Sequence, residues 1–286
     1  MSARFDWYQA TVSGEVPSIM AALSDIAPTG APRWEDMQRA PHGYAFGRRL
    51  NDGDGQVAMV WWGGTHELPH VVSSGETAQP VSELLRTRFP HRVTRADACI
   101  DYADPGAYDR LQDLALDVAR ERKIKVGTAG DHLITKEGRT VYLGAPSSHT
   151  RLRIYDKAAE LRHKFRNDIR HLTVPDNLAR LEFQVRPQTI DAKYHAARLS
   201  PIELMGSTAW GRELMKRVGD MDIEPFAAGK VWRQADDDRA YAAFLAQYGG
   251  LLSRIKGDLG SWACVGEQIG HDLSELTASK MRRRRG

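Results

Sequence analysis

The chain has 286 residues, of which 42% are hydrophobic and 27% charged, so it can bury the core of one large or two modest domains. Its formal net charge of +3 permits nucleic-acid binding without demonstrating it, and no apolar run approaches the roughly 20 residues of a membrane span. Cys99 and Cys264 form neither a disulfide framework nor a zinc-ligand set, and residues 1–7 carry charges where a signal peptide needs an apolar run. We therefore expect a cytoplasmic protein without membrane contact.

The apolar pattern predicts alternating strands and helices as far as about residue 190. Three prolines within 27–42 predict a loop there. The expected strands span residues 4–13, 56–62, 70–73, 92–102, 132–135, 139–143, 150–156 and 178–185. The expected helices span 16–26 and 81–89, a segment opened by Asp104-Pro105, and a charged segment that ends near 166.

Beyond residue 190 the chain reads as helical almost throughout. We therefore expect two parts, an α/β body over 1–190 and a helical C-terminal portion over 191–286. The fold class that this predicts is α+β, with mostly antiparallel curved sheet and helices on one side. The portion ends in a basic run, which is either a solubilising end or a phosphate-binding tail: Arg282, Arg283, Arg284 and Arg285.

Within the strand at 92–102, residues 95–101 carry charge on one face only, because side chains alternate faces along a strand. The odd positions of this stretch are Arg95, Asp97, Cys99 and Asp101, and the even positions are Ala96, Ala98 and Ile100. Two carboxylates on one face can hold a hard cation such as Mg²⁺ or Mn²⁺. Arginine–aspartate ion pairs on a solvated face are the alternative.

The strand at 178–185 repeats this arrangement. Arg180, Glu182 and Gln184 share one face, opposite an apolar stripe. The similarity between Arg95-x-Asp97 and Arg180-x-Glu182 suggests two related halves that each contain one such strand.

The strand at 150–156 places Arg151, Arg153, Tyr155 and Lys157 on one face. A phenol has a pKa near 10, so its attack on a phosphodiester requires nearby cations that favour the phenolate and stabilise the transition state. The alternative is a half-buried tyrosine whose ring lies on the arginine stems.

The order of these three strands along the chain is typical of a known family. The chain resembles the replication initiation factor family (Rep_trans) of rolling-circle plasmids, filamentous phages and integrative elements. The resemblance covers roughly residues 5–190. The motifs that carry it are Arg95-Ala-Asp97-Ala-Cys-Ile-Asp101, Gly138-Arg-Thr-Val-Tyr-Leu-Gly144, Arg153-Ile-Tyr155-Asp156-Lys157-Ala-Ala-Glu160 and Arg180-Leu-Glu182.

The resemblance implies an origin-specific nickase and ligase for rolling-circle replication, in which Tyr155 becomes linked to the 5′ phosphate of the cut strand. It implies that Mg²⁺ or Mn²⁺ is bound by Asp97 and Glu182, with Asp101 as a further candidate ligand. It implies that Arg153, Lys157 and Arg180 contact the scissile or flanking phosphates, with Arg153 and Lys157 assisting Tyr155 in catalysis. Arg95 and Arg151, on the same strand faces, are expected as further DNA-binding residues. The implied partners are single-stranded or supercoiled origin DNA, a host helicase and a second copy of the chain.

Other classes of protein fit less well. Nickases with a pair of metal-binding histidines separated by one residue do not match His66-Glu-Leu-Pro-His70. Tyrosine recombinases are helical around a nucleophile near the C-terminus, whereas Tyr155 lies on an expected strand in mid-chain. A non-catalytic DNA-binding regulator is the remaining alternative. In such a protein Trp61, Trp62 and Tyr142 could stack on bases, although they could equally pack in the core.

Overall fold

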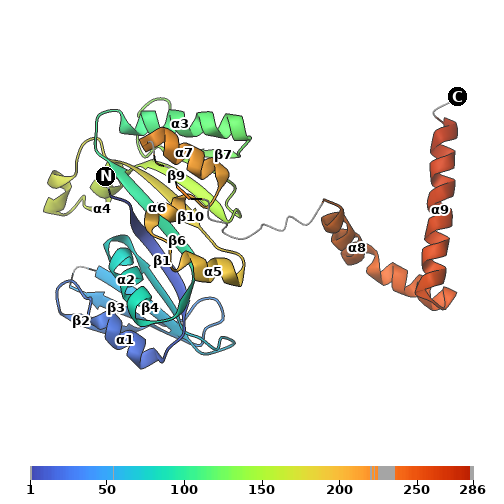
Figure 1. The fold of residues 1–286 in the computed structure, drawn as a ribbon, viewed down its shortest axis with the longest axis horizontal. Helices are drawn as coiled ribbons and strands as arrows, with labels where there is room; N and C mark the ends of the chain where they lie inside the picture. The colour runs from blue at the N-terminus through green and yellow to red at the C-terminus, as the bar shows by residue number, and fades with distance from the viewer. Residues whose placement is uncertain (1, 54, 220, 222, 225–235, 284–286) are drawn as a thin grey trace. The chain divides into compact units, whose positions relative to one another are not determined.

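A computed structural model describes residues 2–53, 55–219, 221, 223–224 and 236–283. The chain divides into two compact units, residues 1–230 and 231–286 (Figure 1). The first unit contains the sheet and the helices packed on it. The described part of the second unit contains α8 (Asp236–Leu259) and α9 (Trp262–Arg283).

The first unit is built on one ten-stranded sheet in which every neighbouring pair of strands is antiparallel. The strand order is β2-β3-β4-β5-β1-β6-β10-β9-β8-β7. The strands are β1 (Arg4–Val12), β2 (Pro32–Asp36), β3 (Phe46–Asp52), β4 (Gly55–Trp62), β5 (His70–Ser74), β6 (His91–Tyr102), β7 (Val126–Ala129), β8 (Thr140–Leu143), β9 (Thr150–Asp156) and β10 (Ala179–Val185). The expected α+β fold is confirmed.

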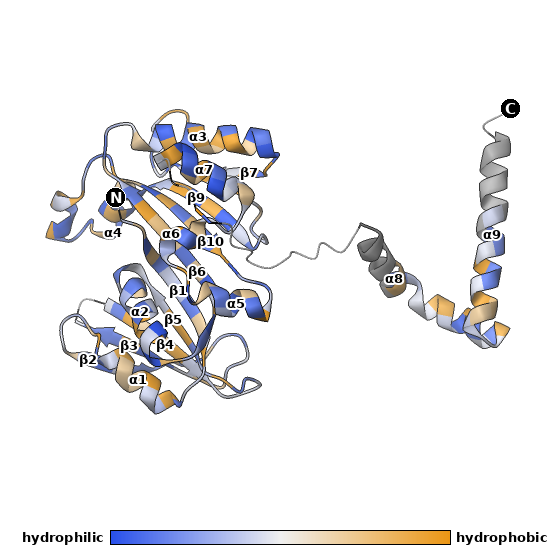
Figure 2. Ribbon diagram, in the orientation of Figure 1, coloured by the Kyte–Doolittle hydropathy of each residue, from blue (hydrophilic) through white to orange (hydrophobic). Residues whose placement is uncertain are grey.

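The helices of this unit are α1 (Val16–Ser24), α2 (Ala78–Arg88), α3 (Ala107–Arg122), α4 (Lys157–Lys164), α5 (Ile190–Ala196), α6 (Pro201–Met205) and α7 (Ala209–Gly219). Buried side chains of α1, α2, α3, α6 and α7 form one continuous apolar core with one face of the sheet. Figure 2 shows hydrophobic and hydrophilic residues alternating along the strands, so the second face of the sheet carries the polar side chains.

The sheet consists of two halves with the same topology, β1 to α2 and β6 to α5. Each half begins with a central strand and a helix, continues through four strands, and ends with a helix that packs on the central strand. Counted outward from the centre, β1, β5, β4, β3 and β2 correspond to β6, β10, β9, β8 and β7. The expectation that each half carries one Arg-x-acid strand is wrong, because β6 and β10 both belong to the second half.

Three local expectations need correction. The loop expected over 27–42 contains the exposed edge strand β2, and the adjoining β3 was not expected at all. The strand expected at 132–135 is a turn, because the Asp131 carboxylate accepts hydrogen bonds from the backbone N–H groups of Leu133, Ile134 and Thr135. The strand of this segment, β7, lies earlier in the chain.

The compact unit extends past residue 190, where we expected the helical portion to begin. Helices α5, α6 and α7 pack against the sheet and supply core residues, among them Ala196, Leu204 and Leu214. Among the described residues, no helix is long and apolar enough to cross a membrane. Arg284 and Arg285 lie outside the described residues, as do the side chains of Arg282 and Arg283.

Candidate active site

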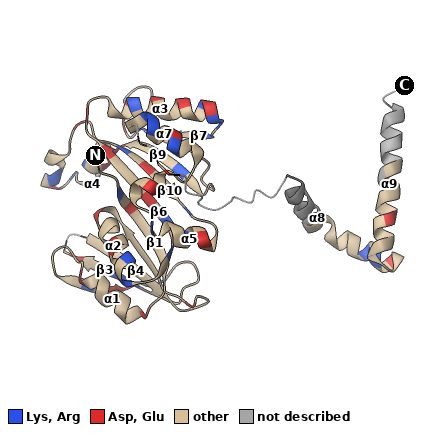
Figure 3. Ribbon diagram, in the orientation of Figure 1, with Lys and Arg blue, Asp and Glu red and all other residues tan. Residues whose placement is uncertain are grey.

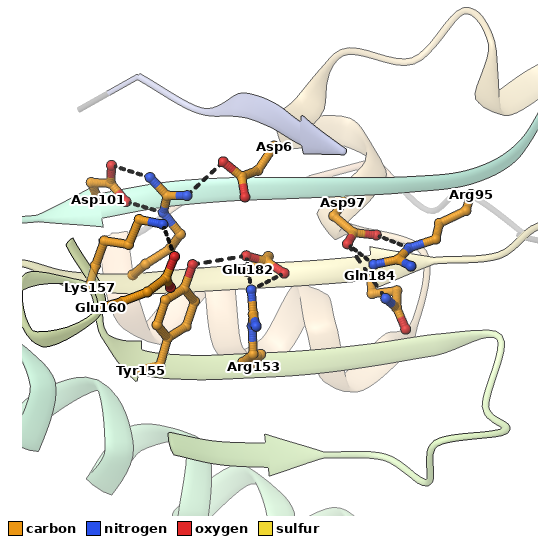
Figure 4. Close-up of polar contacts among 11 residues, drawn as sticks. Asp6, Arg95, Asp97, Asp101, Arg153, Tyr155, Lys157, Glu160, Glu182 and Gln184 are labelled. Carbon is orange, nitrogen blue, oxygen red and sulfur yellow. Dashed lines mark hydrogen bonds and ion pairs between the residues drawn. The ribbon is translucent and has the colours of Figure 1, made fainter. Parts of the chain in front are cut away.

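Three adjacent strands, β6, β10 and β9, bring the expected site residues together on the polar face of the sheet (Figure 4). Their register sets three rows of side chains across these strands. The rows are Asp101–Arg180–Tyr155, Cys99–Glu182–Arg153 and Asp97–Gln184–Arg151. Residues that are separated by as many as 87 positions in the chain therefore become direct or diagonal neighbours.

Tyr155 is 4% exposed, and its hydroxyl donates a hydrogen bond to Glu182 Oε2 at 3.3 Å. The guanidinium of Arg153 lies over the phenol ring, 4.2 Å from its centroid, and the ammonium of Lys157 lies 5.5 Å from it. Burial and the neighbouring Glu182 carboxylate raise the pKa of Tyr155, against the opposing charges of Arg180 and Arg153. The resting phenol is therefore protonated and has an acceptor in place.

Glu182 lies at the centre of the three rows and is 4% exposed. Arg153 Nη2 donates to both of its carboxylate oxygens, at 2.9 and 3.0 Å. Burial raises the pKa of Glu182, Arg153 opposes this, and the nearby Asp97 charge adds to it. Opposite Glu182, burial raises the pKa of the Cys99 thiol to about 12, so this side chain stays neutral.

Asp97 is 3% exposed and is held by the adjacent Arg95. Arg95 donates from Nε at 2.9 Å and from Nη2 at 2.5 Å, and it also lies over the ring of Trp7. The amide of Gln184 lies 3.5 Å from the same carboxylate. Burial raises the pKa of Asp97, and the arginine opposes that shift.

Arg180 is buried and pairs with two carboxylates. It donates to both oxygens of Asp101, at 2.6 and 2.9 Å, and to Asp6 at 2.6 Å. Arg4 Nη2 also donates to Asp101, to its Oδ2 at 2.6 Å. Burial favours the protonated form of Asp101, but the hydrogen bonds and charges of Arg180 and Arg4 outweigh burial and lower its pKa. This network favours a positioning role for Arg180 and Asp101 over contact with DNA or metal.

The sequence pattern, as a local property, did not point to Asp6, because the pairing of β1 with β6 is a tertiary contact. It likewise gave no signal that Lys157 pairs with Glu160 at 2.7 Å at the start of α4. That helix begins directly after β9, where the Asp156 side chain accepts a hydrogen bond from the backbone N–H of Ala159. The helix start thereby fixes the position of Lys157 beside Tyr155.

A small cavity of about 140 Å³ opens next to these rows. Its lining includes Arg95, Arg151 and Arg153, with Glu182 and Gln184 between them. Arg151 lies over the Tyr142 ring, 3.9 Å from its centroid. Guanidinium groups that converge on a polar cavity suit a phosphate oxyanion. Figure 3 shows acidic residues on the central strands as well, so the polar face carries charges of both signs.

Asp97 and Glu182 are the two acidic residues of these rows that were expected to hold a hard divalent cation. They lie diagonally across β6 and β10 on the same face, and each is nine-tenths or more buried. Among the described residues, no group of three or more histidine, cysteine or acidic side chains is arranged around one metal position. Mg²⁺ commonly takes one or two carboxylates and completes its shell with water and phosphate oxygens. In this pair the cation would share the carboxylates with Arg95 and Arg153.

Sequence comparison finds no matching family model and no matching curated protein. Structure comparison finds similarity to the rolling circle replication initiator protein from Geobacillus stearothermophilus, with a TM-score of 0.50. The two chains are 18% identical, and the match covers 80% of this chain and 90% of that one. At this identity the match shows a shared fold.

Proposed function

We propose that this chain is a DNA-nicking and strand-joining initiator of rolling-circle replication, with Tyr155 as the nucleophile. The observation that carries the proposal is the contact between the buried Tyr155 hydroxyl and Glu182 Oε2, beside a cavity lined by three arginines. A phenol with an adjacent proton acceptor and cations for a phosphate forms a nucleophilic site. The shared fold with an initiator protein supports the same conclusion.

The chemistry requires no external energy source. Tyr155 Oη attacks the phosphorus while its proton passes to Glu182, a P–O(tyrosine) bond forms, and the P–O3′ bond breaks. The 3′ oxygen takes a proton from solvent and leaves as a free hydroxyl. In the joining step a 3′ hydroxyl releases its proton to solvent and attacks the phosphorus, so that a P–O3′ bond forms and the P–O(tyrosine) bond breaks. Tyr155 recovers its proton from Glu182.

The arginines act on the phosphate and on the nucleophile. Arg153 contacts both Glu182 and the Tyr155 ring, so it stabilises negative charge as the phenol loses its proton. Arg95 and Arg151 border the cavity, where they would bind the non-bridging or flanking phosphate oxygens. Asp97 and Glu182 would hold Mg²⁺ or Mn²⁺, which supplies further positive charge to the phosphate when bound.

Several features of the proposed biology rest on the family resemblance alone. These are recognition of origin DNA, a host helicase as partner, a homodimer and DNA contact by Lys157. Action in the cytoplasm is proposed from the cysteine content and the charged N-terminal residues, and DNA contact by the arginine tail is proposed from its charge. Lys157 is buried beside Tyr155, so the geometry favours an effect on the phenol over a separate phosphate contact.

A non-catalytic DNA-binding regulator is the second candidate. The specific observation in its favour is that Asp97 and Glu182 are both paired with arginines, as in a purely structural polar cluster. The recombinase alternative has less support, because Tyr155 lies on β9 within a sheet.

Incubation with supercoiled plasmid separates the two candidates. The plasmid carries the DNA that encodes and flanks this chain, and the reaction is divided between Mg²⁺ and excess chelator. A nicking initiator produces open circles and a denaturation-resistant protein–DNA adduct in Mg²⁺. A regulator shifts the plasmid in a native gel and leaves it intact, which would contradict the proposal.

A further inference from the structure

A second cavity, of about 570 Å³, lies in the first half of the sheet. This volume falls in the range of roughly 300–1,000 Å³ that small-ligand sites occupy. Its floor includes Thr11, Trp61 and His70, which are buried side chains of β1, β4 and β5. The loops before β3 and after β4 complete its wall.

This cavity occupies the position that corresponds to the candidate active site in the other half. In the first half, His70 pairs with Thr11 on one side and with Trp61 on the other. In the second half, Arg180 pairs in the same way with Asp101 and with Tyr155. Each outer residue lies one position before the end of its strand, so Trp61 corresponds to Tyr155. The first half thus has the architecture of the site without a tyrosine nucleophile at this position.

The side chains in this position are suited to a flat aromatic ligand. We name as the aromatic cluster the five residues His42, Tyr44, Trp61, His66 and His70, all of which line the cavity. Within it, Tyr44 stacks on His66 at 4.1 Å between centroids, and Trp61 stacks on His70 at 5.4 Å. Burial lowers the pKa of His70 to about 4, so its ring is neutral at physiological pH.

Two polar atoms of the aromatic cluster are buried without a hydrogen-bond partner in the described part of the chain. They are Trp61 Nε1 and His70 Nε2. A buried polar group without a partner is costly, and such groups are retained where a ligand or water completes them. An indole N–H and an imidazole nitrogen match the acceptors and donors on the edge of a nucleobase.

Two cations border the cavity, Arg92 on β6 and Lys193 on α5. Neither forms an ion pair with any residue that the structure describes, whereas Arg95, Arg153 and Arg180 of the candidate active site are each paired with a carboxylate. Arg92 acts electrostatically on both Tyr44 and His70, which places it close to the aromatic cluster. The arrangement provides an aromatic surface for a base with cations beside it for a phosphate. The cavity also has one acidic residue in its wall, Glu67, which can accept from an exocyclic amine.

We propose that this cavity binds one nucleotide of single-stranded DNA, with its base on the aromatic cluster and a flanking phosphate at Arg92 and Lys193. The choice of DNA as the polymer rests on the proposed function. A base in a duplex is stacked and paired, so only an unpaired base can enter. The N-terminal half then binds the single strand at a cavity that corresponds in position to the candidate active site and has Trp61 where that site has Tyr155.

Photochemical cross-linking tests where the base binds. The protein is the full chain with Tyr155→Phe, which prevents cleavage, and the probe is a 20-nucleotide single strand with 5-iododeoxyuridine at its thymine positions. We expect cross-linked peptides from residues 38–45 or 57–70, and we expect excess unlabelled single strand to remove them. Cross-links confined to β9 and β10, or equal competition by the same sequence as duplex, would overturn the proposal.

Anisotropy titration with a fluorescein-labelled form of the same strand tests the contribution to affinity. We expect the double variant Tyr44→Ala/Arg92→Ala to bind about tenfold more weakly, from loss of stacking and of one phosphate contact. Both side chains are partly exposed, which limits the effect on folding, and the unfolding midpoint checks this. The matched control is Arg49→Ala, which removes an exposed charge on β3 outside the cavity and should change the affinity less than twofold.

The two proposals fail separately. An unchanged affinity in the double variant, with nicking intact, would reject the second site and leave the initiator in place. DNA binding in this cavity without any nicking would reject the initiator and leave the second site in place.

Discussion

The Tyr155 hydroxyl donates a hydrogen bond to Glu182 Oε2 at 3.3 Å across the neighbouring strands β9 and β10. The contact is diagonal, because Tyr155 is directly opposite Arg180 and Glu182 is directly opposite Arg153. A proton acceptor therefore lies beside the phenol before any substrate binds. The roles of nucleophile and proton acceptor therefore fall on two different side chains, and each role can be tested by substituting one residue.

Tyr155→Phe should abolish both nicking and the covalent adduct, while DNA affinity stays within a few-fold of wild type. The substitution removes the attacking oxygen and leaves the ring under Arg153. Denaturing gels with end-labelled origin DNA measure the adduct. Tyr142→Phe is the matched control, because Tyr142 lies on the adjacent strand opposite Arg153 and should retain the adduct. An adduct that persists in Tyr155→Phe would show that another residue is the nucleophile.

The nicking rate should rise with pH through an ionisation above the usual glutamate range. The reason is that burial and the charge of Asp97 raise the pKa of Glu182, which accepts a proton only when ionised. Single-turnover rates between pH 4 and 8 measure the midpoint. Asp97→Asn removes one of the raising charges, so the midpoint should fall. Glu182→Gln should reduce the rate by about 10²-fold or more. A rate that keeps its pH midpoint and its size in Glu182→Gln would contradict the role of Glu182 as acceptor.

Chelator should stop nicking by wild-type protein, and Mg²⁺ or Mn²⁺ should restore it. Asp97 and Glu182 are the proposed metal ligands, so Asp97→Ala should require at least tenfold more metal for activity, roughly the effect of losing one ligand contact. Asp101→Asn should leave the metal requirement near wild type, because Asp101 is engaged by Arg4 and Arg180. Full activity of wild-type protein in excess chelator would exclude the metal role.

Arg180→Met should lower the free energy of unfolding by about 3 kcal/mol, because it leaves Asp6 and Asp101 without their shared partner. Urea denaturation at pH 7 measures this, with the slope compared between variants. The control Arg33→Ala breaks an exposed pair on β2 and should cost less than about 1 kcal/mol. Equal stability of Arg180→Met and wild type would show that the network contributes little to folding.

DNA affinity should fall steeply with salt, because phosphate contacts release counterions. If the arginine tail contacts phosphates, deletion of residues 282–286 should flatten the dependence by about three units without moving the nick. Affinity measured from 50 to 300 mM NaCl gives the slope. An unchanged slope would identify the run as a solubilising end.

The sequence by itself determined which side chains share a face. Alternation along a strand is a local property of the backbone, so the placement of Asp97, Glu182 and Tyr155 opposite apolar residues could be read before any tertiary contact was known. The same reasoning failed for β2 and β7, because short exposed strands bury too little apolar surface to leave a pattern.

Only the tertiary structure decided which strands are neighbours. Strand order and register join residues far apart in the chain, and neither follows from the local pattern. Strand order and register bring Arg180 into ion pairs with Asp6 and Asp101. They also place both Arg-x-acid strands in one half of the sheet. They also bring the aromatic cluster together with Arg92 and Lys193 from separate segments of the chain. A site built from long-range contacts becomes visible only when the folded sheet fixes the distances between its strands.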